Sequence, residues 1–177
     1  MIVESGALFN MEDLASLTAT DMIVRTGASV SIKTISNVTL SNLTLESSAT
    51  WDGDITSLIV SNLMQIDGDM FGNYPDIQAG TAVINGSIDA DYLGDIQDVG
   101  TGKGTMTGNG DSDGSGGGHG GAGGQSVSNT STGITFGSRT APVTKGSGGS
   151  QFGGDGGGVI KLSATNITLA GSLSANG

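Results

Sequence analysis

Oxygen-bearing side chains with the spacing of calcium ligands lie in the second half of the chain. The stretch Asn109-x-Asp111-x-Asp113 places possible ligands at every second residue, and Gly114 stands at the sixth position, as at the start of an EF-hand loop. The bidentate glutamate of the twelfth position is absent, because Gly120 stands there. The spacing therefore points to Ca²⁺ as the cofactor, held by an incomplete ligand set.

Three further aspartates, Asp54, Asp76 and Asp95, each precede an isoleucine that recurs about every 20 residues. If each repeat forms one coil of a stack, neighbouring carboxylates would lie ~5 Å apart and repel each other by roughly 0.8 kcal/mol per pair even in water. A bound Ca²⁺ ion, or high salt, would relieve that repulsion. The alternative is that these aspartates favour turns and point apart into solvent.

Other chemistry finds little support in the residue types. The pattern GDSDG at residues 110–114 matches a nucleophile elbow, but such a motif needs a strand-to-helix turn, and a glycine-rich tract produces it by composition. The chain has no cysteine, one histidine (His119), six basic residues and a net charge of −11. We therefore expect no enzymatic activity, no thiolate metal site and no nucleic-acid partner. The longest apolar run is also too short to predict a membrane-spanning helix.

An internal repeat of about 21 residues organises the first half of the chain. Residues 1–11 (MIVESGALFNM) align with residues 22–32 (MIVRTGASVSI) at an offset of 21. Polar residues recur at Asp21, Asn42, Asn62 and Asn166, each directly before an apolar residue. In a stack of coils these residues would form a column, and hydrogen bonds between their side chains would fix the register of the coils. This alignment predicts that Leu63 faces the core. A second apolar column contains Leu14, Ile35, Ile55, Ile77 and Ile96.

The period and the short β-branched stretches within it predict the fold. Apolar residues alternate with period 2, and no segment carries a sustained helical stripe. Short strands on a period near 20 predict an all-β chain folded as a parallel β-helix, or β-solenoid. We expect five coils in residues 1–99, a glycine-rich excursion in residues 100–158 and a final coil in residues 159–177. The five coils are 1–21, 22–42, 43–62, 63–81 and 82–99.

The glycine-rich excursion, residues 100–158, holds 23 of the 33 glycines. Gly/Ser tracts commonly behave as random coil, which is one interpretation. The alternative comes from X-Gly-Gly triplets, such as those in residues 116–124 and 152–157. A three-residue period is typical of polyproline-II-type helices, in which close-packed neighbours require glycine at the contacts. Both alternatives, a flexible loop and a polyglycine-II-like bundle, stay open from the sequence.

The end of the chain carries a family resemblance. Residues 153–177 (GGDGGGVIKLSATNITLAGSLSANG) resemble a glycine-rich module of large bacterial surface proteins, in which glycine runs lead into an I-x-L-x-A strand and a G-x-L-x-A-x-G turn. The first 99 residues are similar, more loosely, to the β-helical shafts of filamentous-haemagglutinin-like adhesins. The resemblance implies an extracellular or cell-surface adhesin, stalk or filament component without enzymatic activity.

The repeat leads to the same expectation of function, a structural role in a long fibrous assembly. The chain starts and stops inside coils, without a capping helix or a signal peptide, which favours a piece of a longer chain or ends covered by other copies. Open coils predict head-to-tail self-association into a fibre, with a surface glycan or receptor as a further partner. Three alternatives remain: a phage tail-fibre or receptor-binding module, a polysaccharide-active β-helix enzyme, and an ice- or glycan-binding module suggested by residues 18–20 and 39–41.

Overall fold

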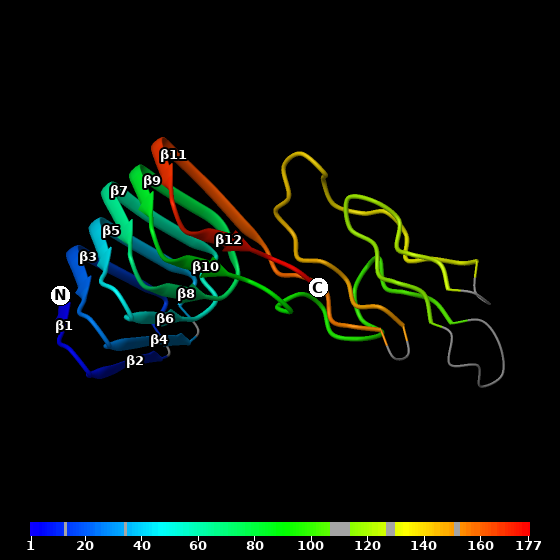
Figure 1. Cartoon of the computed structure of the whole chain (residues 1–177), viewed down its shortest axis with the longest axis horizontal. Coiled ribbons are helices and arrows are strands. Elements are labelled where there is room, and N and C mark those ends of the chain that lie inside the picture. Colours follow the sequence, from blue (N-terminus) through cyan, green and yellow to red (C-terminus); the bar gives the residue numbers. More distant parts are fainter. Residues whose placement is uncertain (13, 34, 107–113, 127–129, 151–152) are drawn as a thin grey trace. The chain divides into compact units, whose positions relative to one another are not determined.

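The chain is built from stacked parallel β-strands, as the repeat predicts. The computed structural model describes residues 1–12, 14–33, 35–106, 114–126, 130–150 and 153–177. These residues contain β-strands and no helix, and the coils of about 21 residues form a β-solenoid (Figure 1). Successive strands alternate between two parallel sheets, so each coil adds one strand to each sheet.

The two sheets differ in the length of their strands. One sheet runs in the order β1 (Ile2–Val3), β3 (Ser16–Val24), β5 (Asn37–Leu45), β7 (Ser57–Ile66), β9 (Tyr74–Ile84) and β11 (Ile160–Leu169). The other contains β2 (Leu8–Glu12), β4 (Ser29–Lys33), β6 (Thr50–Asp52), β8 (Asp69–Phe71), β10 (Ser87–Asp89) and β12 (Ser172–Ser174). Strands β11 and β12 pair with β9 and β10, so the last coil continues both sheets across the glycine-rich insertion.

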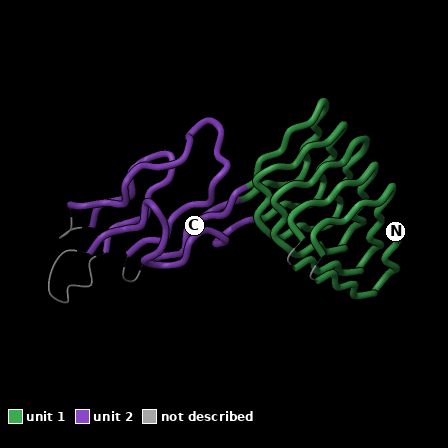
Figure 2. Tube along the Cα trace, turned by 180° about the vertical axis from the view of Figure 1, so that it is seen from behind, with its two compact units in different colours: residues 1–89, 160–174 green, residues 90–159, 175–177 purple. Residues whose placement is uncertain are grey.

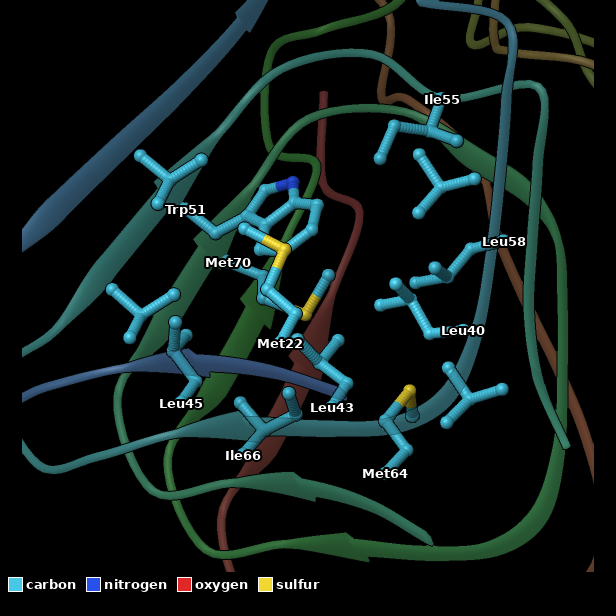
Figure 3. Close-up of a cluster of buried hydrophobic side chains, with 14 of the residues drawn as sticks. Met22, Leu40, Leu43, Leu45, Trp51, Ile55, Leu58, Met64, Ile66 and Met70 are labelled. Carbon is cyan, nitrogen blue, oxygen red and sulfur yellow. The ribbon is translucent and has the colours of Figure 1, made fainter. Parts of the chain in front are cut away.

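The core is a set of columns in which equivalent residues of successive coils stack between the sheets. Trp51 on β6 lies opposite Val30 on β4 and Met70 on β8, and all three side chains are fully buried. Figure 3 shows Trp51 and Met70 pointing into the same interior as side chains from the long sheet. Burying such side chains contributes roughly 1.5–3 kcal/mol each. The solenoid is therefore stabilised by apolar columns along its length.

The long strands turn a corner near their middle, and this corner corrects the predicted register. Residues of β7 and β5 pair as Leu40 with Val60, but then as Asn42 with Leu63, so β7 has one residue more than β5 at the corner. Met64 therefore occupies the core column that contains Leu43 and is fully buried, whereas Leu63 is half-buried. The prediction that Leu63 faces the core was wrong by one residue.

The second predicted apolar column is also interrupted. Ile35, Ile55 and Ile77 are buried, whereas Leu14 and Ile96 are exposed. Moreover, Ile77 pairs with Leu58 and not with Ile55. The cause is the varying length of the connections, because four residues join β6 to β7 (53–56) and two join β8 to β9 (72–73). A constant period in the sequence thus hides compensating changes in the loops.

Glycines allow the tight turns of the last three coils to stack directly on one another. A Cβ atom at Gly86 would lie 1.9 Å from the carbonyl oxygen of Gly68, and one at Gly171 would lie 1.8 Å from that of Gly86. No side chain fits such spacing. In the earlier coils the turn has four residues, and positive φ angles occur at Gly6, Gly27 and Ser48. Along the solenoid, the turns therefore change in type. The early turns contain a residue with positive φ, and the later turns contain a glycine that packs on the turn of the preceding coil.

The chain divides into two compact units, coloured separately in Figure 2. The solenoid unit consists of residues 1–89 and 160–174, and the glycine-rich unit consists of residues 90–159 and 175–177. Residues 90–99, which the sequence assigns to the fifth coil, belong to the glycine-rich unit in this division.

In the glycine-rich unit, the described segments are joined to one another by backbone hydrogen bonds. Gly116 donates its N–H to Gly124 and accepts from Gly133, while Gly123 donates to Gly133, so three segments bond to one another in different directions. A Cβ atom at Gly123 would lie 2.0 Å from the Gly116 carbonyl oxygen. Such close backbone contacts, with bonds to several neighbours, are the features expected of a polyglycine-II-like bundle and not of a random coil. Three buried serines, Ser115, Ser147 and Ser150, add side-chain bonds inside it.

Candidate functional site

The aspartates predicted to form a carboxylate column each have a different hydrogen-bond or ion-pair partner. Asp54 Oδ1 accepts the backbone N–H of Asn73 at 2.7 Å. Asp76 accepts from Gln78 at 2.8 Å and lies 3.6 Å from Lys161 Nζ. Asp95 belongs to the glycine-rich unit, where Lys145 Nζ lies 3.0 Å from its carboxylate. The predicted carboxylate column requires Ile77 to lie opposite Ile55. Because Ile77 lies opposite Leu58 instead, Asp54 and Asp76 are not aligned as that column requires.

The second predicted calcium ligand set falls outside the described residues. Asn109, Asp111 and Asp113 lie in the 107–113 gap. Within the residues that the structure does describe, no group of three or more acidic, histidine or cysteine side chains is placed to hold a metal ion. A calcium site at Asn109, Asp111 and Asp113 stays a prediction.

The predicted polar column is present at its first step. Asn42 Nδ2 donates a 2.7 Å hydrogen bond to Asp21 Oδ1 of the preceding coil. Asn62 is not in this column, because the extra residue of β7 places Leu63 opposite Asn42. Asn166 returns to the column opposite Thr81, separated from Asn42 by two coils. The corner therefore carries one Asp–Asn bond and no continuous amide ladder.

A different polar contact ties neighbouring coils at the four-residue turns. Arg25 Nη1 lies 2.6 Å from Glu46 Oε1, and the backbone N–H of Thr26 donates to Glu46 Oε2 at 3.0 Å. These bonds hold the pKa of Glu46 below its usual value, with the Thr26 backbone bond as the largest cause and the Arg25 bond next. Glu46 therefore links two coils most strongly when it is ionised.

Both ends of the solenoid expose some of the last residues of the core columns, although Val3 and Met11 at the first end are buried. In the column of Val30, Trp51 and Met70, the terminal members Phe9 and Leu173 are 37% and 39% exposed. On the long sheet, Ile167 and Leu169 of β11 are 52% and 50% exposed. Strands β1, β2, β11 and β12 pair on one side only among the described strands. The two ends thus present apolar side chains beside unpaired strand edges, which favours pairing with a further strand.

A shallow hollow of about 350 Å³ opens on the outer face of the long sheet at the corner. It is lined by Thr18, Ala19, Thr20, Thr39, Leu40, Ser41 and Ser61. The sequence drew attention to residues 18–20 and 39–41 but not to Ser61. The register shift of β7 between Val60 and Leu63 brings Ser61 to the hollow, and this shift leaves no signal in the repeat.

The glycine-rich unit contains a larger hollow of about 570 Å³, lined mostly by glycine backbone. His119 and Asp155 are its titratable lining residues. His119 Nε2 lies 3.0 Å from Thr144 Oγ1, and its ring packs edge-to-face on Phe136 with centroids 4.9 Å apart. Asp155 accepts the N–H of Gln97 at 3.0 Å. Both side chains thus have partners that fix segments of the bundle.

No helix in the described residues is long and apolar enough to cross a membrane. Comparison with known proteins found no matching family model, no similar curated protein and no similar solved structure.

Proposed function

We propose that this chain is a structural component of an extracellular or cell-surface fibre, an appendage or an adhesin stalk, without enzymatic activity. The observation that carries the proposal is the exposure of the core columns at both ends of the solenoid. Leu173 and Phe9 belong to the same column at opposite ends, as do Leu169 and Val3. A second copy stacked head-to-tail would therefore continue each column with an apolar residue.

The register within the solenoid specifies the contacts of such a stack. Strand β11 of one copy would pair with β1 of the next, and β12 with β2, in the parallel sense of all strand pairs within each sheet. Leu173 would then contact Phe9 of the next copy, and Leu169 would contact its Val3. Stacking would cover Phe9, Leu169 and Leu173, which are partly exposed in the single chain, whereas Val3 is already buried. The burial of these apolar side chains would drive association.

The net charge of −11 sets the conditions for assembly. Like-charged copies repel each other, and salt screens this repulsion while leaving apolar burial intact. We therefore expect association to increase with ionic strength, which is the opposite of an assembly held by ion pairs.

The test is light scattering with size-exclusion chromatography, followed by negative-stain electron microscopy, at low and high salt. We expect rod-shaped oligomers of uniform width whose length grows with protein and salt concentration. Leu173→Asp should abolish them while leaving the circular dichroism spectrum unchanged. Ile59→Asp is the matched control, because Ile59 is exposed on the outer face of β7 between Thr39 and Gln78, away from both ends. Monomers of the unchanged chain under all conditions would contradict the proposal.

A phage tail-fibre or receptor-binding module is a second candidate, supported by the glycine-rich unit. Its hydrogen-bonded segments form a compact bundle, and a compact bundle can display loops for recognition. Removing residues 90–159 and joining the coils with a short turn separates the two candidates. A fibre component should still assemble, whereas a receptor-binding module should lose attachment to its target cells.

A further inference from the structure

We propose that the hollow at the corner of the long sheet is a binding site for a neutral saccharide. Five of the residues that line it carry a hydroxyl group: Thr18, Thr20, Thr39, Ser41 and Ser61. This proposal goes beyond the structural role in a fibre. It does not depend on fibre assembly, because every residue that lines the hollow belongs to the solenoid unit of a single chain. Its volume, about 350 Å³, lies at the lower end of the range for small-molecule sites, roughly 300–1,000 Å³.

The hydroxyls of the hollow are free to bind a ligand. Other hydroxyls on the coils are engaged: Thr50 donates to Ser29 at 2.8 Å, and Ser87 donates to Asp69 at 2.7 Å. The five hydroxyls of the hollow, by contrast, form no side-chain hydrogen bond with any described residue. A hydroxyl both donates and accepts, so a set of five matches a ligand that carries hydroxyls itself.

The geometry of the corner explains why the hollow forms here. Between the residue pairs that flank the corner, β5 has one residue, Ser41, and β7 has two, Ser61 and Asn62, and none of the three is buried. Irregularities of this kind are frequent beside binding sites. Thr18 lies directly opposite Thr39 on the neighbouring strand, and adjacent strands lie ~4.8 Å apart.

The composition of the hollow favours a saccharide over charged ligands and over ice. None of its lining residues is charged, which argues against phosphate, carboxylate or cationic ligands. Threonine methyl groups and Ala19 add small apolar surfaces suited to the C–H faces of a sugar ring. A regular ice-binding array would need the threonine column to continue, but Ile59 and Gln78 follow Thr39 in it.

The test is a titration of the ¹⁵N-labelled chain with three neutral probes, maltohexaose, cellohexaose and chitohexaose, followed by NMR. We expect at least one of them to shift the amide signals of Thr18, Thr39 and Ser41 in a saturable way. Thr39→Val keeps the shape and removes one hydroxyl, so it should weaken binding about fivefold, the effect of losing one hydrogen bond. Thr44→Val is the matched control, because Thr44 lies on the same strand outside the hollow, opposite Ile23 and Gln65.

Three results would overturn the proposal. The first is the absence of shifts with all three probes, and the second is a set of shifts centred away from the corner. The third is thermal hysteresis that Thr39→Val abolishes, without any response to the probes, because it would assign the hydroxyls to ice. Repeating the titration with Leu173→Asp separates the two proposals, since a monomeric variant should retain the saccharide site.

Discussion

Met64 lies directly opposite Leu43 in the parallel pair of β5 and β7, and both side chains are fully buried (Figure 3). The two residues are 21 positions apart, although the polar residues before them, Asn42 and Asn62, are only 20 apart. The extra residue at the corner of β7 accounts for the difference. Sequence likeness and structural equivalence therefore diverge at this coil.

Met64→Asp should unfold the solenoid, whereas Leu63→Asp should leave it folded. A charge at Met64 would be buried in an apolar column at a cost of roughly 4 kcal/mol or more, which is a large part of the stability of a small domain. Leu63 is half-buried at the corner, where a carboxylate can reach water. Circular dichroism and urea unfolding of both variants measure the difference. Equal loss of the β-sheet signal would contradict the register of β7.

The sequence predicted the class of the fold because stacking forces a period onto the chain. The coil length, the parallel sheets and the burial of Ile35, Ile55 and Ile77 follow from that period. The alignment of individual coils could not be predicted in the same way. Leu63 and Met64 are both apolar, and only the backbone at the corner decides which one enters the core.

Gly123→Ala should disrupt the glycine-rich unit, and Gly124→Ala should be tolerated. A Cβ atom at Gly123 would lie 2.0 Å from the Gly116 carbonyl oxygen, whereas one at Gly124 would meet no atom within 4 Å. The first change forces packed backbones apart, and the second leaves them in place. Amide hydrogen exchange at Gly116 and Gly133 should accelerate in the first variant alone. Equal exchange rates in both variants would mean that the extended segments are not closely packed.

Glu46 should make the solenoid sensitive to acid. Its pKa is lowered in the folded chain by bonds from the Thr26 backbone and from Arg25, so the ionised form favours folding. This contribution is present above the usual pKa of glutamate, about 4.3, and is lost as the pH falls through the lower folded value. Melting temperatures of Glu46→Gln and the unchanged chain should differ at neutral pH and converge in acid. Glu12→Gln, which removes the carboxylate of a more exposed pair with Lys33, serves as the comparison.

Trp51 should report on the folding of the solenoid alone. It is the one tryptophan of the chain, it is fully buried, and its Nε1 has no hydrogen-bond partner among the described residues. We expect a blue-shifted emission that moves to longer wavelength in a single transition with urea, in step with the loss of circular dichroism. The emission of Gly123→Ala should be unchanged in the absence of urea, because that substitution lies in the other unit. A solvent-exposed emission in the native chain would contradict the burial of Trp51.

A calcium titration decides the remaining metal prediction. Asp54 and Asp76 already accept hydrogen bonds, so Asp54→Asn and Asp76→Asn should leave any calcium binding unchanged. Binding should depend instead on Asp111 and Asp113, and Asp111→Asn should abolish the calorimetric signal. A signal that disappears in Asp54→Asn would restore the carboxylate column as the site.

The candidate sites were less accessible to sequence reasoning than the fold. The threonines at positions 18, 20 and 39 were visible as a composition, but Ser61 joins them only through the register shift of β7. The exposed residues Ile167, Leu169 and Leu173 fit the repeat as well as buried ones do. Their exposure comes from the absence of a neighbouring strand among those described, which no property of their own positions encodes.

The insertion between β10 and β11 also sets an order of folding. Strands of neighbouring coils up to β10 pair across about 20 residues, but β11 pairs with β9 across about 86, from Tyr74 to Ile160. Closing the longer loop costs ~1 kcal/mol more in chain entropy. The first five coils can therefore form one after another as the chain emerges from the ribosome. We therefore expect β11 to dock last, after the glycine-rich segment has been synthesised.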